Sequence, residues 1–229
     1  MKEHLVVLTG AGISAESGLK TFRDSGGLWE GHRVEDVATP EAFTRNPELV
    51  LRFYNERRKQ LDEVEPNEAH KLLAELENYY RVSIVTQNVD DLHERGGSNN
   101  VLHLHGELRW GCSSNNKNIR EYLGSREIAM KDKAADGSAL RPDIVWFGES
   151  VPKMDEAIEL VLSADLFLLV GSSLQVYPAA GLIHYVPIGK PIYIIDPNHH
   201  GEKHGKSVTV IQETAVNGMK LLFNKLAGA

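Results

Sequence analysis

Residues 4–15 read HLVVLTGAGISA, an apolar run, His4–Thr9, that opens directly into a glycine-rich turn. A short apolar run bounded by glycine is typical of a buried strand. The turn matches G-x-G-x-x-[G/A], in which backbone N–H groups at a helix N-terminus can approach a pyrophosphate. The same residues also suit a tight turn that binds nothing. This stretch therefore predicts a strand, a turn and a helix, and it leaves the ligand open.

The order of strand, small or polar loop and helix recurs along the chain. Further apolar runs lie at residues 82–86, 140–147 and 191–195 and at Leu166–Val170, with a weaker one at Val208–Ile211. Such alternation indicates an α/β fold with a Rossmann-like parallel sheet and helices on both faces, whose ligands bind at the carboxyl ends of the strands. Helices are predicted at residues 47–64, 67–78, 154–163, 178–185 and 215–226.

Two stretches interrupt this order and predict a smaller inserted module. Residues 31–81 have a mostly helical pattern, and residues 111–141 are polar and weakly patterned. We expect these two insertions to form a small domain. Residues 1–30, 82–110 and 142–229 are then expected to form the Rossmann-like domain.

The composition favours a soluble globular protein. The 229 residues are 41% hydrophobic and 25% charged, with a net charge of −7. No apolar run approaches the roughly 20 residues that cross a bilayer, and no Lys/Arg cluster suggests a nucleic-acid footprint. The apolar run after residue 4 is too short for a signal peptide. We expect a cytoplasmic monomer that binds neither nucleic acid nor membrane.

Polar residues follow the apolar run at 82–86, where residues 86–90 read TQNVD. Asn and Asp side chains at a strand end can hydrogen-bond a carboxamide. They are also favoured as helix N-caps, so the motif alone supports both roles equally.

Two histidines, His103 and His105, stand two residues apart in the sequence HLHGE. On a strand they would share one face, which suits a metal pair. No further ligand accompanies them, so a core or catalytic role is favoured. A histidine beside glycine is accessible and has a pKa near working pH, so His105 can serve as a general base.

Residues 21–29, TFRDSGGLW, lie where a nicotinamide dehydrogenase has a second strand that ends in an acid. The missing acid disfavours a dehydrogenase. A glycine-bearing loop can instead fold over a cofactor, and Arg23 can offer a cation to its phosphates. A surface ion pair is the alternative role for Arg23.

These motifs, in this order, resemble the sirtuins. The resemblance includes GAGIS at 10–14, FR at 22–23, TQNVD at 86–90, HG at 105–106 and FGE at 147–149, with GSS at 171–173 in place of Gly-Thr-Ser. It covers roughly residues 5–110 and 140–225. It implies that NAD is bound by Gly10, Ala11, Gly12, Ser14, Phe22, Arg23, Gln87, Asn88, Asp90, Gly171, Ser172, Ser173, Asp196 and Ala215.

The resemblance also implies an NAD-dependent protein-lysine deacylase. Asn88 and Asp90 would orient the nicotinamide while the acyl-lysine carbonyl oxygen displaces it from the ribose, and His105 would then act as general base on a ribose hydroxyl. The products would be lysine, nicotinamide and O-acyl-ADP-ribose. The acylated protein would bind as an extended peptide by strand addition to residues 145–149. The substrate-binding residues there would be Val145, Phe147, Gly148 and Glu149.

A finer signal concerns the acyl group. Tyr54 and Arg57 are three residues apart and share a helix face, as in the Tyr-x-x-Arg pair of class III sirtuins. This resemblance implies that they hold the distal carboxylate of succinyl- or malonyl-lysine, a contact worth about 1.5–3 kcal/mol, with acetyl-lysine also accepted. A solvated basic face is the alternative, because Arg52, Arg58 and Lys59 are also basic.

One departure from the sirtuin pattern concerns metal. The family usually carries two cysteine pairs in the stretch that corresponds to residues 111–141, and Cys112 is the only cysteine of this chain. A structural zinc site needs about four N or S ligands, so we expect no zinc. The segment would then be held by a small apolar core, for which the candidates are Ile119, Tyr122, Leu123, Ile128 and Met130.

Two other functions fit the same motifs. A protein mono-ADP-ribosyltransferase would transfer the ribose to a protein side chain. A catalytically reduced NAD- or ADP-ribose-binding protein is disfavoured because His105, Asn88 and Asp90 are all present.

Overall fold

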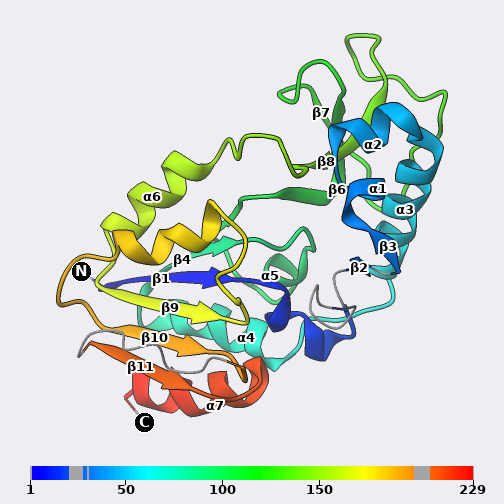
Figure 1. Ribbon diagram of the computed structural model, residues 1–229. Coiled ribbons are helices and arrows are strands. Elements are labelled where there is room, and N and C mark those ends of the chain that lie inside the picture. The colour runs from blue at the N-terminus through cyan, green and yellow to red at the C-terminus, as the bar shows by residue number, and fades with distance from the viewer. Residues whose placement is uncertain (1, 21–27, 30, 199–206, 229) are drawn as a thin grey trace.

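The computed structural model describes residues 2–20, 28–29, 31–198 and 207–228. Its centre is a six-stranded sheet in the order β11-β10-β9-β1-β4-β5, and every neighbouring pair is parallel (Figure 1). The predicted parallel α/β fold is confirmed. The strands are β1 His4–Thr9, β4 Arg81–Thr86, β5 Val101–His103, β9 Leu166–Val170, β10 Ile192–Ile195 and β11 Val208–Ile211.

Helices cover both faces of this sheet (Figure 1). Helices α4 Glu68–Glu75 and α7 Ala215–Leu226 pack on one face, and α6 Met154–Leu162 and the 3-10 helix η4 Ala179–Tyr185 pack on the other. Alternate residues of β1 therefore enter two different cores, and all six are buried. Burial on both sides explains why these strands read as continuous apolar runs in the sequence.

A smaller module lies beyond the carboxyl ends of the strands (Figure 1). It joins three helices to the antiparallel sheet β7-β6-β8, and Val50, Phe53, Leu108 and Trp146 share its core. A two-stranded ribbon, β2-β3, completes it. Its elements are β2 Leu28–Trp29, β3 His32–Arg33, α1 Val34–Val37, α2 Pro40–Arg45, α3 Pro47–Gln60, β6 Gly106–Ser113, β7 Arg120–Tyr122 and β8 Leu140–Ile144.

Some predicted elements differ from the observed ones. The helix expected after the glycine turn is two 3-10 turns, η1 Ala11–Ile13 and η2 Ala15–Ser17, and Gly18, with φ of 102°, ends them. The helix expected over residues 47–64 ends at Gln60. The helix expected over residues 67–78 divides into α4 and the 3-10 turn η3 Leu76–Asn78.

The packing also bears on where the small module begins and ends. Ala69, Leu72 and Leu73 of α4 belong to the core of the large sheet, and strand β6 starts within the stretch assigned to the large domain. We therefore propose that the first insertion ends before α4, and that the second begins at β6.

The core expected within residues 111–141 is partly present. Leu123 and Ile128 are buried together, and Ile119 packs against them. Tyr122 and Met130 are 65% and 55% exposed, so their assignment to this core is wrong. Tyr122 instead lies with its ring edge-on to Trp110 on the neighbouring strand.

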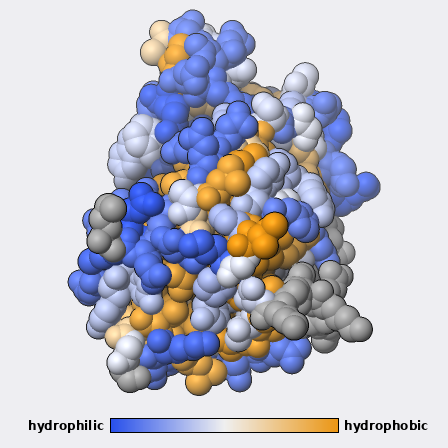
Figure 2. All heavy atoms as spheres, turned by 90° about the vertical axis from the view of Figure 1, so that its left-hand side faces the viewer, coloured by the Kyte–Doolittle hydropathy of each residue, from blue (hydrophilic) through white to orange (hydrophobic). Residues whose placement is uncertain are grey.

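The side of the molecule where the large sheet's strands begin carries apolar groups interspersed among polar ones (Figure 2). In the part of the chain that the structure describes, no helix is both long and apolar enough to cross a membrane.

Candidate active site

A cavity of about 490 Å³ lies between the carboxyl ends of the large sheet's strands and the small module. All of the site residues predicted from the sequence line this cavity, apart from two. Those two, Phe22 and Arg23, lie outside the described residues. The structure therefore brings together motifs that are up to about 200 positions apart in the sequence, which is the arrangement that parallel α/β sheets produce at their strand ends.

The glycine turn forms one wall and is tied to the neighbouring strand. The N–H of Gly10 donates to the carbonyl of Val170 at 3.1 Å, and that of Gly12 donates to the carbonyl of Gly171 at 2.9 Å. A Cβ on Gly12 would lie 2.7 Å from the Cα of Gly171. The N–H groups of Gly10 and Gly12 therefore donate within the protein. These glycines allow two backbones to touch.

A buried cluster joins this turn to the end of β4. The hydroxyl of Ser14 donates to the Asp90 carboxylate at 3.0 Å, and the Asn88 amide donates to the Ser14 oxygen at 3.1 Å. All three residues are less than 8% exposed. Burial raises the pKa of Asp90 to about 6, although the N–H of Leu92 and the Ser14 hydroxyl stabilise its charge. The cluster places an amide and a carboxylate, the partners that a carboxamide needs, on one wall.

The next strand ends extend this wall. The Gln87 amide donates to the Ser172 hydroxyl at 3.0 Å, which joins the ends of β4 and β9. Asp196 follows β10 and is 4% exposed, and Ala215 begins α7. A carboxylate at this place can accept hydrogen bonds from ribose hydroxyls.

The position of His105 suits a general base. Its Nδ1 lies 3.0 Å from the carbonyl oxygen of Gln87. Because a carbonyl only accepts, Nδ1 carries the proton, and Nε2 of the neutral ring is the basic nitrogen. Burial lowers the pKa of His105, and the hydrogen bond to Gln87 opposes this in part. The ring is therefore neutral, and able to accept a proton, at neutral pH.

His103 has a different role from His105. Its Nδ1 lies 3.0 Å from the Asn88 carbonyl and its Nε2 lies 2.8 Å from the Glu94 carboxylate. Burial lowers the pKa of His103, but the hydrogen bond to Glu94 outweighs burial, so the pKa is raised overall. Both ring nitrogens are occupied by protein, so His103 holds the loop that carries Asn88. Among the described residues, no group of three or more His, Cys, Asp or Glu is placed to hold a metal ion.

The opposite end of the cavity is formed by α3. Tyr54 is fully buried and Arg57 is partly exposed, and both line the cavity, so the alternative of a solvated helix face is wrong for this pair. Arg58, which had supported that alternative, is 1% exposed and donates to the Leu108 carbonyl at 2.7 Å. The Nε atom of Arg57 is buried and has no hydrogen-bond partner among the described residues. A buried unpaired guanidinium nitrogen beside a cavity suits an anionic ligand.

The segment that follows β8 lies along the rim. The N–H of Val145 donates to the carbonyl of His105 at 2.9 Å, and that of Phe147 donates to the carbonyl of Ala38 at 3.0 Å. Gly148 is exposed and has φ of 89°. The carboxylate of Glu149 points inward and accepts from Arg141 at 2.9 Å, so the Glu149 side chain braces this segment.

Comparison with known proteins agrees with this geometry. Residues 10–178 match the sequence model of the Sir2 family. The chain is 53% identical over 225 residues to a Bacteroides thetaiotaomicron protein named NAD-dependent protein deacylase, and the match covers 96% of each chain. The chain belongs to the Sir2 family.

Solved structures of Sir2 proteins share the whole fold. A Sir2 homologue in complex with ADP-ribose is 38% identical, has a TM-score of 0.89, and the match covers 99% of this chain and 93% of that one. A Sir2 homologue in complex with NAD is 38% identical, has a TM-score of 0.88, and the match covers 99% and 90% of the two chains. The sirtuin resemblance drawn from the sequence motifs is therefore confirmed.

In this Sir2 chain, Cys112 is buried on β6. Burial raises the pKa of its thiol to about 12, so the thiol is protonated at neutral pH and is not a reactive nucleophile. That this Sir2 protein carries no zinc stays a prediction for metal analysis of the purified protein.

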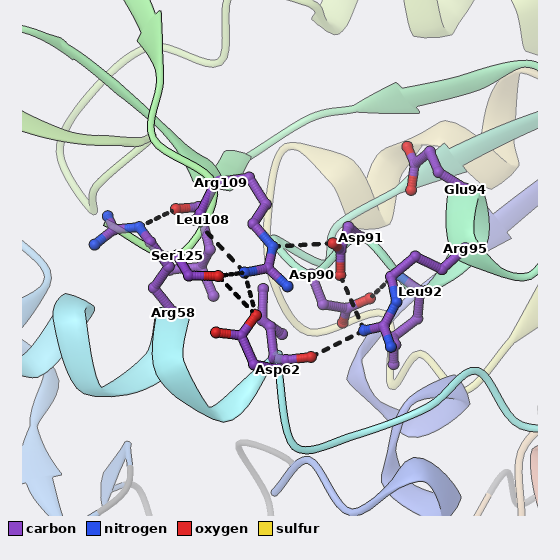
Figure 3. A network of polar contacts seen from close by, with 12 residues as sticks. Arg58, Asp62, Asp90, Asp91, Leu92, Glu94, Arg95, Leu108, Arg109 and Ser125 are labelled. Carbon is purple, nitrogen blue, oxygen red and sulfur yellow. Dashed lines mark hydrogen bonds and ion pairs between the residues drawn. The ribbon is translucent and has the colours of Figure 1, made fainter. Parts of the chain in front are cut away.

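A charged network joins the two parts of the Sir2 fold (Figure 3). Arg109 of β6 donates to Asp91 at 3.0 Å and to Asp62, just after α3, at 2.7 Å. Arg95, on the short helix α5 Leu92–Arg95, lies 3.6 Å from Asp91. Asp91 directly follows Asp90, so this network ties the small module to the loop that carries the buried carboxylate. No motif in the sequence indicated it, because Asp62 and Arg109, which bring in the small module, are far from each other and from Asp91 in the chain.

Proposed function

We propose that this chain is an NAD-dependent protein-lysine deacylase that acts on succinyl- and malonyl-lysine and also on acetyl-lysine. The observation that carries the proposal is the ring of His105, whose Nδ1 proton is held by Gln87 so that Nε2 is the basic nitrogen on the cavity. The names of close relatives and the NAD and ADP-ribose complexes of Sir2 homologues support the same activity.

The residues of the cavity fit NAD. Asn88 and Asp90 provide an amide and a carboxylate for the nicotinamide carboxamide, and Asp196 provides an acceptor for the adenosine ribose. The glycine turn and the loop that begins at Gly171 form the wall between these two places. When bound, NAD supplies a glycosidic bond whose leaving group, nicotinamide, departs as a neutral molecule.

The chain's own groups then have separate tasks. The buried cluster of Ser14, Asn88 and Asp90 holds the carboxamide, which fixes the direction in which nicotinamide leaves. His105 accepts a proton from a ribose hydroxyl at Nε2, and the carbonyl of Gln87 keeps the ring in the required tautomer. The low exposure of these groups limits water, which would otherwise compete with the acyl-lysine oxygen as nucleophile.

The kind of acyl group that we propose is inferred from the end of the cavity formed by α3. Arg57 presents a buried nitrogen without a hydrogen-bond partner in the described residues, and Tyr54 lies one helical turn before it on the same wall. A carboxylate at the end of an acyl chain would fill that unsatisfied position, whereas an acetyl group would leave it empty. The acylated protein would enter as an extended peptide along residues 145–149, near the exposed Gly148.

A panel of one peptide sequence bearing acetyl-, malonyl-, succinyl- or glutaryl-lysine tests the proposal directly. Mass spectrometry with and without NAD should show free lysine and O-acyl-ADP-ribose only when NAD is present, with the dicarboxylic acyl groups removed faster than acetyl. Label from adenine-labelled NAD that stays on protein would instead identify an ADP-ribosyltransferase. Binding of NAD with no turnover of any peptide would instead indicate an NAD-binding protein without deacylase activity.

A further inference from the structure

Trp146 connects the peptide-binding segment to the acyl end of the cavity. Its indole Nε1 donates a hydrogen bond to the Tyr54 hydroxyl oxygen at 3.0 Å, across 92 positions of sequence. Both residues line the cavity, and they are 2% and 0% exposed. Trp146 also lies directly between Val145 and Phe147, which face the same cavity. A single side chain thus reaches from the rim to the far end of the site.

The indole ring of Trp146 is fixed from behind. The guanidinium of Arg141 lies 3.3 Å from the centre of the ring and donates to the Ile144 carbonyl at 2.8 Å. The same guanidinium forms two contacts with the Glu149 carboxylate, at 2.9 and 3.2 Å. Glu149 in turn accepts the backbone N–H of Trp146 at 2.7 Å. The Arg141–Glu149 ion pair therefore holds both the ring and the backbone of Trp146, and such charge-assisted contacts are directional.

The hydrogen bond from Trp146 determines the donor and acceptor roles of the Tyr54 hydroxyl. An indole N–H can only donate, so the Tyr54 oxygen is the acceptor and its own O–H must point away from Trp146. Burial raises the pKa of Tyr54, and this keeps the phenol protonated at neutral pH. The Tyr54 hydroxyl can therefore donate a hydrogen bond, but only in directions away from the Trp146 indole.

We propose that Trp146 is a positioning residue for acyl selectivity: it orients the Tyr54 hydroxyl so that this group donates to the distal carboxylate of a dicarboxylic acyl chain paired with Arg57. The inference rests on the proposed function and extends it to Trp146, beyond the predicted pair Tyr54 and Arg57. Trp146 acts through Tyr54, so its contribution exists only when Tyr54 carries a hydroxyl.

Trp146→Phe is the variant that tests this, because it keeps an aromatic ring beneath Arg141 and removes only the N–H donor and part of the ring. We expect the ratio of succinyl to acetyl kcat/KM to fall about tenfold, mainly through KM for the succinyl peptide, as the loss of one oriented hydrogen bond to a charged group implies. Phe43→Leu is the matched control. Phe43 packs 5.4 Å from the Trp146 ring and is not part of the cavity wall, so this change loosens the packing and keeps the N–H.

A double-mutant cycle with Tyr54→Phe separates orientation from packing. If Trp146 acts through the hydroxyl, Trp146→Phe should change the ratio by less than about twofold when Tyr54 is already Phe. The same tenfold loss in both backgrounds, or a similar loss in Phe43→Leu, overturns the proposal. Thermal unfolding of each variant shows whether the fold is kept.

Calorimetric titration of succinyl- and acetyl-lysine peptides provides a readout that needs no turnover. If the wild-type protein removes no acyl group, the proposed function fails, and the titrations still test Trp146. Equal affinity of the wild-type protein for the two peptides overturns the inference, and so does a selectivity that Trp146→Phe leaves intact.

Discussion

The two ends of the cavity are built in different ways. The end assigned to NAD is formed by strand ends of one sheet, where backbone meets backbone at Gly12 and Gly171. The end assigned to the acyl group is formed by side chains from α3 and from the segment after β8, joined by the Trp146–Tyr54 hydrogen bond. The first depends on the fold itself. The second depends on a few side chains, which can change without disturbing the sheet. Chemistry and selectivity should therefore respond separately to substitution.

The largest expected effect comes from His105→Ala. Loss of the general base should lower deacylation by about 10²- to 10⁴-fold, and by a similar factor for acetyl- and succinyl-lysine, because the base lies at the end that all substrates share. Release of O-acyl-ADP-ribose, followed by mass spectrometry, measures this. His184→Ala is the control, since His184 is exposed on η4 and is not part of the cavity wall. An unaffected rate in His105→Ala would remove the basis of the proposed function.

Gly171→Ala tests whether the NAD end is part of the fold's stability. Gly171 has φ of 62°, and an added Cβ would lie 2.4 Å from the backbone nitrogen of Ile13. We expect the free energy of unfolding to fall by about 3 kcal/mol or more, from backbone strain and overpacking together. Gly148→Ala is the matched control, because it has φ of 89° with nothing within 4 Å and should lose only about 1–2 kcal/mol. Equal losses in urea unfolding would show that close packing here is unimportant.

The two ends also differ in how far the sequence predicted them. Strands β1, β9 and β11 and helix α7 have the predicted bounds, because strands covered on both faces are continuous apolar runs and amphipathic helices have a clear period. Strands β5 and β7 have three residues each, which is too short for a pattern. All described site residues of the NAD end reached the cavity, since strand ends of a parallel sheet converge.

The side-chain contacts of the acyl end were not predictable in the same way. Glu149 lines the cavity as predicted, but its ion pair with Arg141 had no signal in the sequence. Burial disfavours the charge of Glu149, yet the hydrogen bonds from Arg141 and Lys117 outweigh it and lower the pKa of this carboxyl group. In the sequence, Trp146 stands out only as part of the apolar run at residues 140–147. Partners separated by 92 positions, such as Trp146 and Tyr54, leave no local signal in one sequence.

Asp90→Asn tests whether the NAD end holds a destabilising charge. Burial raises the pKa of Asp90 to about 6 from an ordinary 3.8, so the folded state binds the proton more tightly than the unfolded state. The ionised carboxylate therefore destabilises the fold above about pH 6, and this effect disappears as the pH falls through 6 toward 3.8. We expect Asp90→Asn to raise the free energy of unfolding by up to about 3 kcal/mol at pH 8 and hardly at all at pH 4. Urea unfolding at both pH values measures it, and a gain that does not depend on pH would contradict the assignment.

Arg57→Met should have the smallest free-energy effect and the most selective one. Removing the guanidinium should lower the ratio of succinyl to acetyl kcat/KM by roughly 10- to 150-fold, which corresponds to a charge-assisted contact of about 1.5–3 kcal/mol. Arg52→Met is the matched control, because Arg52 is exposed on the same helix and is not part of the cavity wall. Stability should fall only slightly, since Arg57 is partly exposed and its Nε has no hydrogen-bond partner to lose among the described residues. The contact of its guanidinium with the Phe53 ring, 5.0 Å from the ring centre, is worth about 0.5–1 kcal/mol. An equal loss on both peptides would mean that the acyl end is not separable from the chemistry, and the contrast between the two ends of the cavity would fail.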